Sequence, residues 1–151
     1  MVWGCMGWNY VGILTEVQGI MNAVQYCEIL DGGVVPSFEK LDMEEGGRYF
    51  QQDNDPKHTS KWADRWFEVN DIELLGWPAQ SPDLNPIEHL WNHMKKQLKK
   101  YREPPRGVHE LWERVVEEWE AIEPEVCQRL IESMPRRIQA VIKAKGGHTK
   151  Y

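Results

Sequence analysis

Three acidic side chains stand at positions from which they could hold a metal ion. Asp53 and Asp55 lie in the segment QQDNDPKHTS, just after a short apolar run, and Glu88 follows farther along the chain. Carboxylate oxygens are the ligands that Mg²⁺ prefers in proteins. Acids that hold two such ions about 3.5–4 Å apart can activate water and stabilise the leaving oxygen of a phosphodiester. These residues are therefore candidates for phosphodiester chemistry.

The same acids also fit structural roles. Asp53 and Asp55 could be turn residues whose carboxylates accept hydrogen bonds from nearby backbone N–H groups. Glu88 could complete a capping box with Asn85 and only finish the start of a helix. The residue types alone leave the metal site and the structural roles open.

Two predicted strands and one predicted helix would position the acids. The runs RYFQQ (48–52) and IELLGW (72–77) predict strands, and Asp53 follows the first of them. Asn85-Pro86 predicts the start of a long helix, with proline at its first position and Glu88 in its first turn. Strand ends and the start of the following helix are usual places for a metal site in an open α/β sheet. This order would bring Asp53 and Glu88 together.

The other elements complete a chain in which strands come first and helices follow. The runs 1–5 and 12–17 predict a hairpin. We expect helices from Asn22 to a stop at Gly32-Gly33, from Pro36 to about Met43, after a cap at Thr59 or Ser60, over 108–122, and over 125–144 with a break at Pro135. Gly46-Gly47 and Pro104-Pro105 are expected helix stops. The pattern predicts an α/β sheet with helices packed on it.

Composition is that of an ordinary globular protein. The chain has 151 residues, of which 41% are hydrophobic and 28% charged, so we expect one domain over 1–151. Three widely spaced cysteines form no CxxC pair and predict free thiols. Eight tryptophans, several at helical spacing, predict a mainly buried set. No apolar run is long enough to cross a membrane, so no membrane partner is expected.

The chain carries a net negative charge, but two of its segments are rich in basic residues. The net charge of −6 argues against binding nucleic acid by global charge. The segment 95–106, however, holds six basic residues against one acid, and 136–151 holds five basic residues and no acid. A local basic surface on an acidic body therefore remains open.

Long stretches of the chain resemble the catalytic core of mariner-superfamily DDE transposases. The resemblance lies in FQQDNDPKHTS and LLGWPAQSPDLNPIEHLWNHMKKQL, and extends to MVWGCM, MNAVQYCEIL and SMPRRIQAVIKAKGGHTKY, so it covers nearly the whole chain. It implies a ribonuclease H-like mixed sheet flanked by helices, with a helical C-terminal region. It further implies Mg²⁺- or Mn²⁺-dependent cutting of double-stranded DNA at transposon ends, joining to target DNA, a nuclear location and a homodimer.

The resemblance also distinguishes the two aspartates. In this branch of the family, 34 residues separate the second and third catalytic acids. Here 34 residues separate Asp53 from Glu88, and 32 separate Asp55 from Glu88. The resemblance thus implies that Asp53 and Glu88 are catalytic acids and metal ligands, and that Asp55 is a neighbour that shapes the turn.

The first acid of the family motif is expected on a strand before the segment MVWGCM. We therefore expect a sheet that lacks the first strand and a polypeptide that is inactive alone, because Glu16, Asp31 and Asp42 are poor substitutes. The alternative is a non-catalytic relic or a domesticated domain that binds DNA or a protein partner.

Several basic residues near the acids are candidate DNA contacts. Lys57 and His58 follow Asp53 in the same segment, and Lys95, Lys96 and Lys99 follow Glu88 on the same predicted helix. Lysines that neutralise phosphates supply most sequence-independent affinity for DNA. A histidine that packs locally and a solvated lysine face are the structural alternatives.

Overall fold

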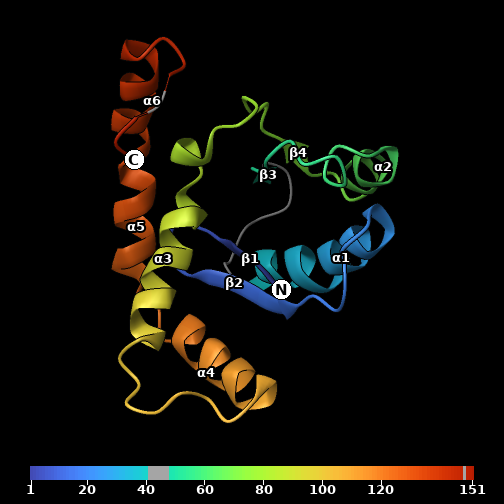
Figure 1. Ribbon diagram of the computed structural model, residues 1–151. Coiled ribbons are helices and arrows are strands. Elements are labelled where there is room, and N and C mark those ends of the chain that lie inside the picture. Colours follow the sequence, from blue (N-terminus) through green and yellow to red (C-terminus); the bar gives the residue numbers. More distant parts are fainter. Residues whose placement is uncertain (41–47, 148) are drawn as a thin grey trace. The chain divides into compact units, whose positions relative to one another are not determined.

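The computed structural model describes residues 1–40, 48–147 and 149–151. Within this range the chain forms two compact units, the first built from Met1–Cys5 and Gly12–Ser81 and the second from Met6–Val11 and Pro82–Tyr151. Strands and two helices make up the first unit, and the second is helical apart from a hairpin turn (Figure 1). In the described part of the chain, no helix is long and apolar enough to cross a bilayer.

The first two strands form the predicted hairpin. β1 (Val2–Met6) pairs with β2 (Val11–Glu16). The backbone N–H of Gly7 donates to Tyr10 O at 3.0 Å across the turn, and Val17 N–H donates to Met1 O at 2.8 Å at the open end. These two bonds show that the strands run antiparallel.

One long helix replaces the two that the sequence predicts between Asn22 and Met43. α1 (Ala23–Lys40) begins at the predicted cap, where Asn22 Oδ1 accepts Gln25 N–H at 2.9 Å, but it continues through Gly32, Gly33 and Pro36. The predicted stop at Gly32-Gly33 is therefore wrong. The expected end at Met43 and the break at Gly46-Gly47 lie outside the described residues.

Packing explains why the glycines do not end α1. A Cβ on Gly33 would lie 2.5 Å from Trp3 Cζ3, so glycine is needed there for close contact with β1. Ser37, 1% exposed, donates to Gly33 O at 2.5 Å and accepts Ile13 N–H at 2.7 Å from β2. Tertiary contacts thus outweigh the weak helix propensity of the glycines.

The strand that leads to Asp53 is short and pairs in parallel. β3 (Tyr49–Phe50) lies beside β4 (Glu73–Leu74), with Tyr49 opposite Glu73 and Phe50 opposite Leu74. α2 (Lys61–Val69) connects them, and Ser60 caps it as predicted by accepting Ala63 N–H at 3.2 Å. Both strands are confirmed but are shorter than the predicted runs.

The core of the first unit forms between α1 and α2. It consists of Tyr26, Leu30, Val34, Phe38, Ala63, Trp66, Phe67 and Ile72. Trp66 also donates its indole N–H to Asp31 Oδ1 at 2.7 Å, which satisfies the polar atom of a mostly buried ring. The helix α1, which packs against the hairpin, therefore also supports the crossover between β3 and β4.

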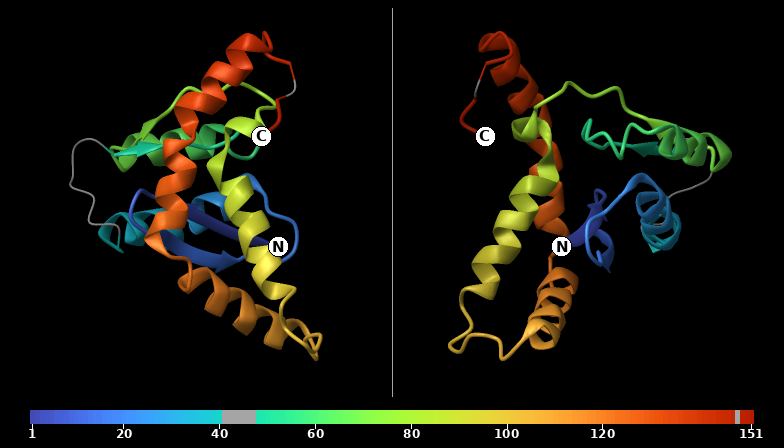
Figure 2. Two further views of the ribbon diagram at one scale, coloured as in Figure 1. Left: turned by 90° about the vertical axis from the view of Figure 1, so that its left-hand side faces the viewer. Right: turned by 45° about the vertical axis from the view of Figure 1, so that its right-hand side comes forward.

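The second unit consists of a short turn and the helices that follow it along the chain. The 3₁₀ turn η1 (Pro82–Leu84) leads into α3 (Pro86–Leu98), which α4 (Val108–Glu120), α5 (Pro124–Glu132) and α6 (Met134–Lys143) follow. α5 lies alongside α3 in both views of Figure 2. α5 and α6 meet at Ser133, next to the predicted break at Pro135.

Tryptophans serve two purposes in this fold. Trp119 is fully buried and stacks on Trp91 with ring centroids 4.9 Å apart, as the core interpretation predicts. Trp8 and Trp62 are instead 47% and 67% exposed, so the prediction of a mainly buried set fails for them. Helical spacing identifies a face of a helix but does not show whether that face is covered.

Candidate active site

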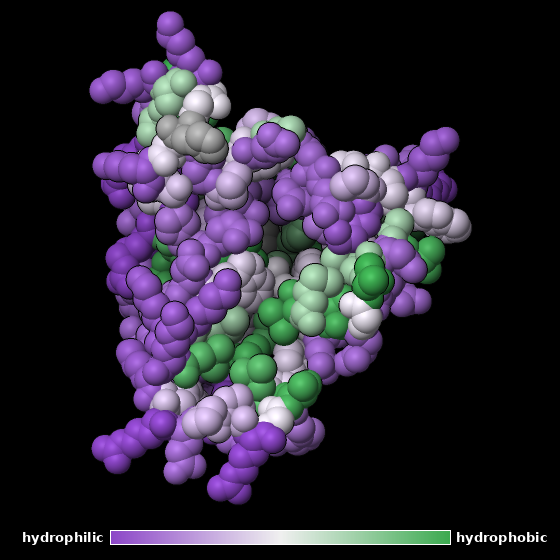
Figure 3. All heavy atoms as spheres, viewed as in Figure 1, coloured by the Kyte–Doolittle hydropathy of each residue, from purple (hydrophilic) through white to green (hydrophobic). Residues whose placement is uncertain are grey.

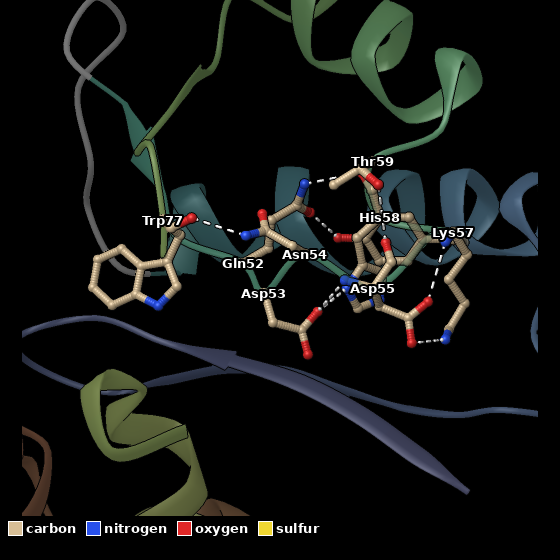
Figure 4. A network of polar contacts seen from close by, with 9 residues as sticks. Gln52, Asp53, Asn54, Asp55, Lys57, His58, Thr59 and Trp77 are labelled. Atoms are coloured by element: carbon tan, nitrogen blue, oxygen red, sulfur yellow. Dashed lines mark hydrogen bonds and ion pairs between the residues drawn. The ribbon is translucent and has the colours of Figure 1, made fainter. Parts of the chain in front are cut away.

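The segment after β3 forms a tight loop around the carboxylate of Asp53 (Figure 4). Asp53 Oδ1 accepts the backbone N–H of Asp55 at 3.1 Å, and His58 Nδ1 donates to the same oxygen at 2.6 Å. The Asp53 side chain is 61% exposed, and no hydrogen bond from the described residues reaches Oδ2. One oxygen therefore fixes the carboxylate while the other remains available to a ligand.

His58 is held firmly enough to orient Asp53. Its side chain is only 15% exposed, and its ring lies against the ring of Tyr26 with centroids 4.3 Å apart. Because Nδ1 faces a carboxylate, the tautomer with hydrogen on Nδ1 is assigned. His58 Nε2 is buried and meets no hydrogen-bond partner among the described residues. Among the described residues, the imidazole thus makes a single side-chain hydrogen bond, which goes to Asp53.

Two uncharged side chains close the network behind His58. The Tyr26 hydroxyl donates to Gln52 Oε1 at 2.5 Å, and Gln52 Nε2 donates to His58 O at 3.0 Å. Burial, followed by the charge of Asp53, raises the pKa of Tyr26 far above its usual value, so the hydroxyl stays a neutral donor. Asn54 Nδ2 donates to Trp77 O at 2.8 Å and ties the loop to the segment after β4.

Asp55 has a different environment from Asp53. Its Oδ1 accepts Lys57 N–H at 3.1 Å, and its Oδ2 pairs with Lys57 Nζ at 2.5 Å. The hydrogen bond from Lys57 is the main cause that holds the pKa of Asp55 below its usual value. Both carboxylate oxygens are therefore occupied within the loop, as expected of a residue that shapes the turn.

Glu88 lies in the first turn of α3, in the second unit. Asn85 makes no side-chain cap bond, and its backbone N–H donates to Pro82 O at 3.1 Å. The reciprocal bonds of a capping box are therefore not formed, and the exposed Glu88 carboxylate is not used as a cap. The positive end of the α3 dipole lies at this turn. Next to it, burial and then the charge of Arg137 lower the pKa of His89.

Exposed lysines follow Glu88 along one face of α3. Glu88, Lys95 and Lys99 are spaced so that they stack on the same side of the helix, and Lys96 borders it. All four are exposed. Figure 3 shows that hydrophilic side chains also dominate the outer side of α5 and α6. Lys57 and His58, by contrast, are paired with Asp55 and Asp53, so their contact with DNA stays a prediction.

The carboxylates suit a divalent ion chemically. Asp53 offers a carboxylate with one oriented and one open oxygen, and Glu88 offers an exposed carboxylate at a helix N-terminus. Both are oxygen donors of the kind that Mg²⁺ and Mn²⁺ accept. Within residues 1–40, 48–147 and 149–151, no three His, Cys, Asp or Glu side chains form a group that could hold a metal.

Sequence reasoning missed the residues that support the loop. Tyr26 keeps helical spacing with Ala23, Cys27 and Leu30, so the sequence marks it only as part of an apolar helix stripe, and Gln52 and Asn54 carry no distinctive signal. Their roles depend on contacts 26 and 23 residues away along the chain, for Tyr26 with Gln52 and Asn54 with Trp77. A polar hydroxyl on an otherwise apolar stripe is the one hint that the sequence offered.

Comparison with known proteins gives one family and one fold. Residues 19–111 match the family described as "DDE superfamily endonuclease". The chain is 44% identical over 151 residues to the "Transposable element Tc1 transposase" of Caenorhabditis elegans, covering 100% of the chain and 54% of that protein. The chain thus spans about half the length of the curated relatives it matches.

Solved structures match the same stretch. The catalytic domain of the Mos1 mariner transposase superposes with a TM-score of 0.85 at 21% identity, covering 99% of the chain and 75% of that domain. A "mariner Mos1 paired end complex with Mg" superposes with a TM-score of 0.81 at 24% identity, covering 95% of this chain and 42% of that chain. The predicted fold class, an α/β ribonuclease H-like fold with flanking helices, is confirmed.

Proposed function

The chain belongs to the DDE superfamily of endonucleases, as a catalytic domain of the Tc1/mariner type, and we propose that Asp53 and Glu88 are two of its catalytic metal ligands. The observation that carries this proposal is the Asp53 carboxylate, which His58 holds through one oxygen while the other is open. The substrate is double-stranded DNA at transposon ends and at the target. A bound Mg²⁺ or Mn²⁺ supplies an activated water and charge stabilisation at the scissile phosphodiester.

The protein's own groups prepare the carboxylates for this task. His58 fixes the rotamer of Asp53, and Tyr26 and Gln52 fix His58, so that the ligand needs little reorganisation. Glu88 stands at the start of α3, where the helix dipole favours negative charge. Asp55 and Lys57 neutralise each other and keep the turn closed without competing for the ion.

The exposed lysines of α3 are the proposed DNA track. Lys95, Lys96 and Lys99 lie on or beside the face that carries Glu88, so DNA phosphates bound there would run along the same helix. The Mos1 paired-end complexes support DNA as the partner and Mg²⁺ or Mn²⁺ as the ion. Their pairing of ends also motivates a homodimer, and chromosomal DNA as substrate motivates a nuclear location.

We further propose that this 151-residue polypeptide is inactive alone. The described residues group no third acid with Asp53 or Glu88, and two-ion chemistry needs more carboxylates than these two. The second candidate function, DNA binding without catalysis, is favoured by the same observation. The two candidates differ in one respect: only the first requires Asp53 and Glu88 to bind a metal ion.

Metal binding tests the first candidate directly. Titration of the protein with Mn²⁺, followed by the electron paramagnetic resonance signal of the free ion, should show weak binding that Asp53→Asn and Glu88→Gln each abolish. Glu113→Gln removes an exposed acid from α4 and is the matched control, which should bind Mn²⁺ like the wild type. Equal binding by all four proteins would exclude Asp53 and Glu88 as ligands.

Nicking and DNA binding complete the test. With Mn²⁺ and a supercoiled plasmid, the chain should give background nicking; robust nicking that Glu88→Ala removes would overturn the proposed inactivity. DNA affinity should fall steeply with salt, and changing Lys95, Lys96 and Lys99 to Gln together should reduce that salt dependence. An unchanged salt dependence would remove these lysines from the DNA surface.

A further inference from the structure

We propose that Arg137 and Thr149 are positioning residues for Glu88, because they hold the turn from which α3 begins. The proposal rests on the proposed function in one respect, namely that Glu88 is a metal ligand. Its structural part concerns only the second unit and the contacts made to Asp83.

Arg137 is an unusual residue to bury. It lies on α6, is only 2% exposed, and has no carboxylate within ion-pair distance among the described residues. Its Nε donates to Ser133 Oγ at 2.7 Å, and Nη1 donates to Asp83 O at 2.8 Å. A buried cation is costly unless its donors are satisfied. Loss of the bond to the η1 carbonyl would therefore leave a buried charged donor unsatisfied and reduce the stability of the unit.

Thr149 also binds Asp83, through the side chain and not the backbone carbonyl. Its hydroxyl donates to Asp83 Oδ2 at 2.8 Å, and its Oγ1 accepts Tyr151 N–H at 3.3 Å. The Tyr151 ring lies 5.2 Å from the Arg137 guanidinium carbon, in cation–π contact. The last residues of the chain thus close over Arg137, and both the backbone and the side chain of Asp83 are bound.

Asp83 transmits this restraint to Glu88 through backbone bonds. In η1, Pro82 O accepts Asn85 N–H at 3.1 Å, and Asn85 O accepts Glu88 N–H at 3.2 Å. These bonds link η1 to the first turn of α3. The contacts that Arg137 and Thr149 make with Asp83 therefore help to set the direction of that turn. A displacement of 1 Å at a catalytic group can cost about a hundredfold in rate.

Ordinary tail packing would have a different signature. If the C-terminal residues only stabilised the unit, their loss would speed amide exchange evenly in α3, α4 and α5. A positioning role instead predicts a local effect at Asn85 and Glu88. Amide hydrogen exchange, read by NMR, separates the two.

The test uses Thr149→Val, which removes the hydroxyl and nearly keeps the shape. Exchange at Asn85 and Glu88 should become about tenfold faster, as the loss of one hydrogen bond predicts. Amides of α4 should change less than about twofold, and Thr149→Ser, which keeps the hydroxyl, should behave like the wild type. A uniform change over the unit, or no change at Asn85 and Glu88, would overturn the proposal.

A matched arginine provides the control for Arg137→Met. Arg114 also donates to a loop carbonyl of the second unit, Glu103 O at 2.7 Å, but on α4. Arg137→Met should speed exchange at Asn85 and Glu88, whereas Arg114→Met should leave both unchanged. Equal effects of the two variants would refute a specific role for Arg137.

Paramagnetic broadening by Mn²⁺ then connects the restraint to the metal. In the wild type, Mn²⁺ should broaden the amide signals of Asp53 and Glu88; in Thr149→Val, both should need several-fold more Mn²⁺, because the two carboxylates share the ion in the proposed function. Absence of broadening in the wild type would refute the proposed function and leave the exchange result standing. Broadening at Glu88 that is identical in both proteins would refute the positioning role.

Discussion

Asp53 and Glu88 are held in place by contacts of opposite range. Asp53 accepts hydrogen bonds from Asp55 and His58, two and five residues farther along the chain. The turn before Glu88 is bound through Asp83 by Arg137 and Thr149, 54 and 66 residues farther along. One acid is oriented within a single loop, and the other depends on the folding of an entire helical unit.

This difference predicts unequal robustness. Local turns form without closing a long chain loop, whereas contacts between distant residues require a loop closure that costs entropy. Partial unfolding should therefore release Glu88 before it releases the contact between Asp53 and Asp55. The Asp53 loop also has long-range supports, among them the bond from Asn54 to Trp77 O and the packing of His58 on Tyr26. The contact with Tyr26 is the place to test the contrast.

Tyr26→Ala should have the largest effect. Tyr26 is 1% exposed and contributes to the core between α1 and α2, so its truncation should reduce the free energy of unfolding by about 3–5 kcal/mol. Urea unfolding followed by circular dichroism measures the loss. Tyr10→Ala, at a side chain that is 51% exposed, is the control and should cost less than about 0.5 kcal/mol. Similar losses in both variants would contradict the proposed core position.

Arg137→Met should come next. It deprives Asp83 O and Ser133 Oγ of a charged donor, so the free energy of unfolding should fall by about 1.5–3 kcal/mol. The same urea experiment applies, with Arg114→Met as the comparison because its ion-pair partner Glu110 lies one turn away on the same helix. If Arg114→Met costs as much as Arg137→Met, long-range bonds hold the second unit no more strongly than local ones.

The same distinction decides how much the sequence could predict. The Ser60 cap, the Asn85-Pro86 helix start and the break near Pro135 follow from residues within a few positions of one another, and each is confirmed. The family resemblance, through its 34-residue spacing, singled out Asp53 and Glu88, and their catalytic role stays a prediction. Both carboxylate oxygens of Asp55 are occupied within the loop, as expected of a residue that shapes the turn.

Errors and omissions occurred where distant residues decide the outcome. Gly33 was interpreted as a helix stop because glycine is a weak helix former, but its contact with Trp3 keeps it inside α1. Arg137 was counted with the basic tail, although burial makes it a ligand of a backbone carbonyl. No local pattern could reveal either contact, since each partner lies at least thirty residues away.

His58→Ala should weaken metal binding more than folding. Without the Nδ1 donor, Asp53 loses the bond that fixes its carboxylate, and loss of such an outer partner typically costs about tenfold or more in metal affinity. Mn²⁺ titration measures the change, and urea unfolding should show a loss of only about 1 kcal/mol. His58→Asn can place an amide donor near the position of Nδ1 and should recover part of the affinity; no recovery would indicate that the ring, and not the donor, matters.

Lys57→Met should have the smallest effect, a slight loss of stability near neutral pH that disappears in acid. Lys57 lowers the pKa of Asp55 in the folded protein, so the unfolded state binds a proton more readily than the folded state. The resulting stabilisation is present above the ordinary pKa of about 4 and is lost as the pH falls through the lower, folded pKa. Because this pair is partly exposed, its contribution should stay below about 1 kcal/mol.

Unfolding free energies measured between about pH 2 and pH 6 should therefore fall less steeply on acidification in Lys57→Met than in the wild type. Lys61→Met, which removes a neighbouring charge outside this pair, should keep the wild-type slope. If Lys61→Met flattens the slope as much as Lys57→Met does, a general charge effect accounts for the acid sensitivity. The contact between Lys57 and Asp55 would then not be its cause.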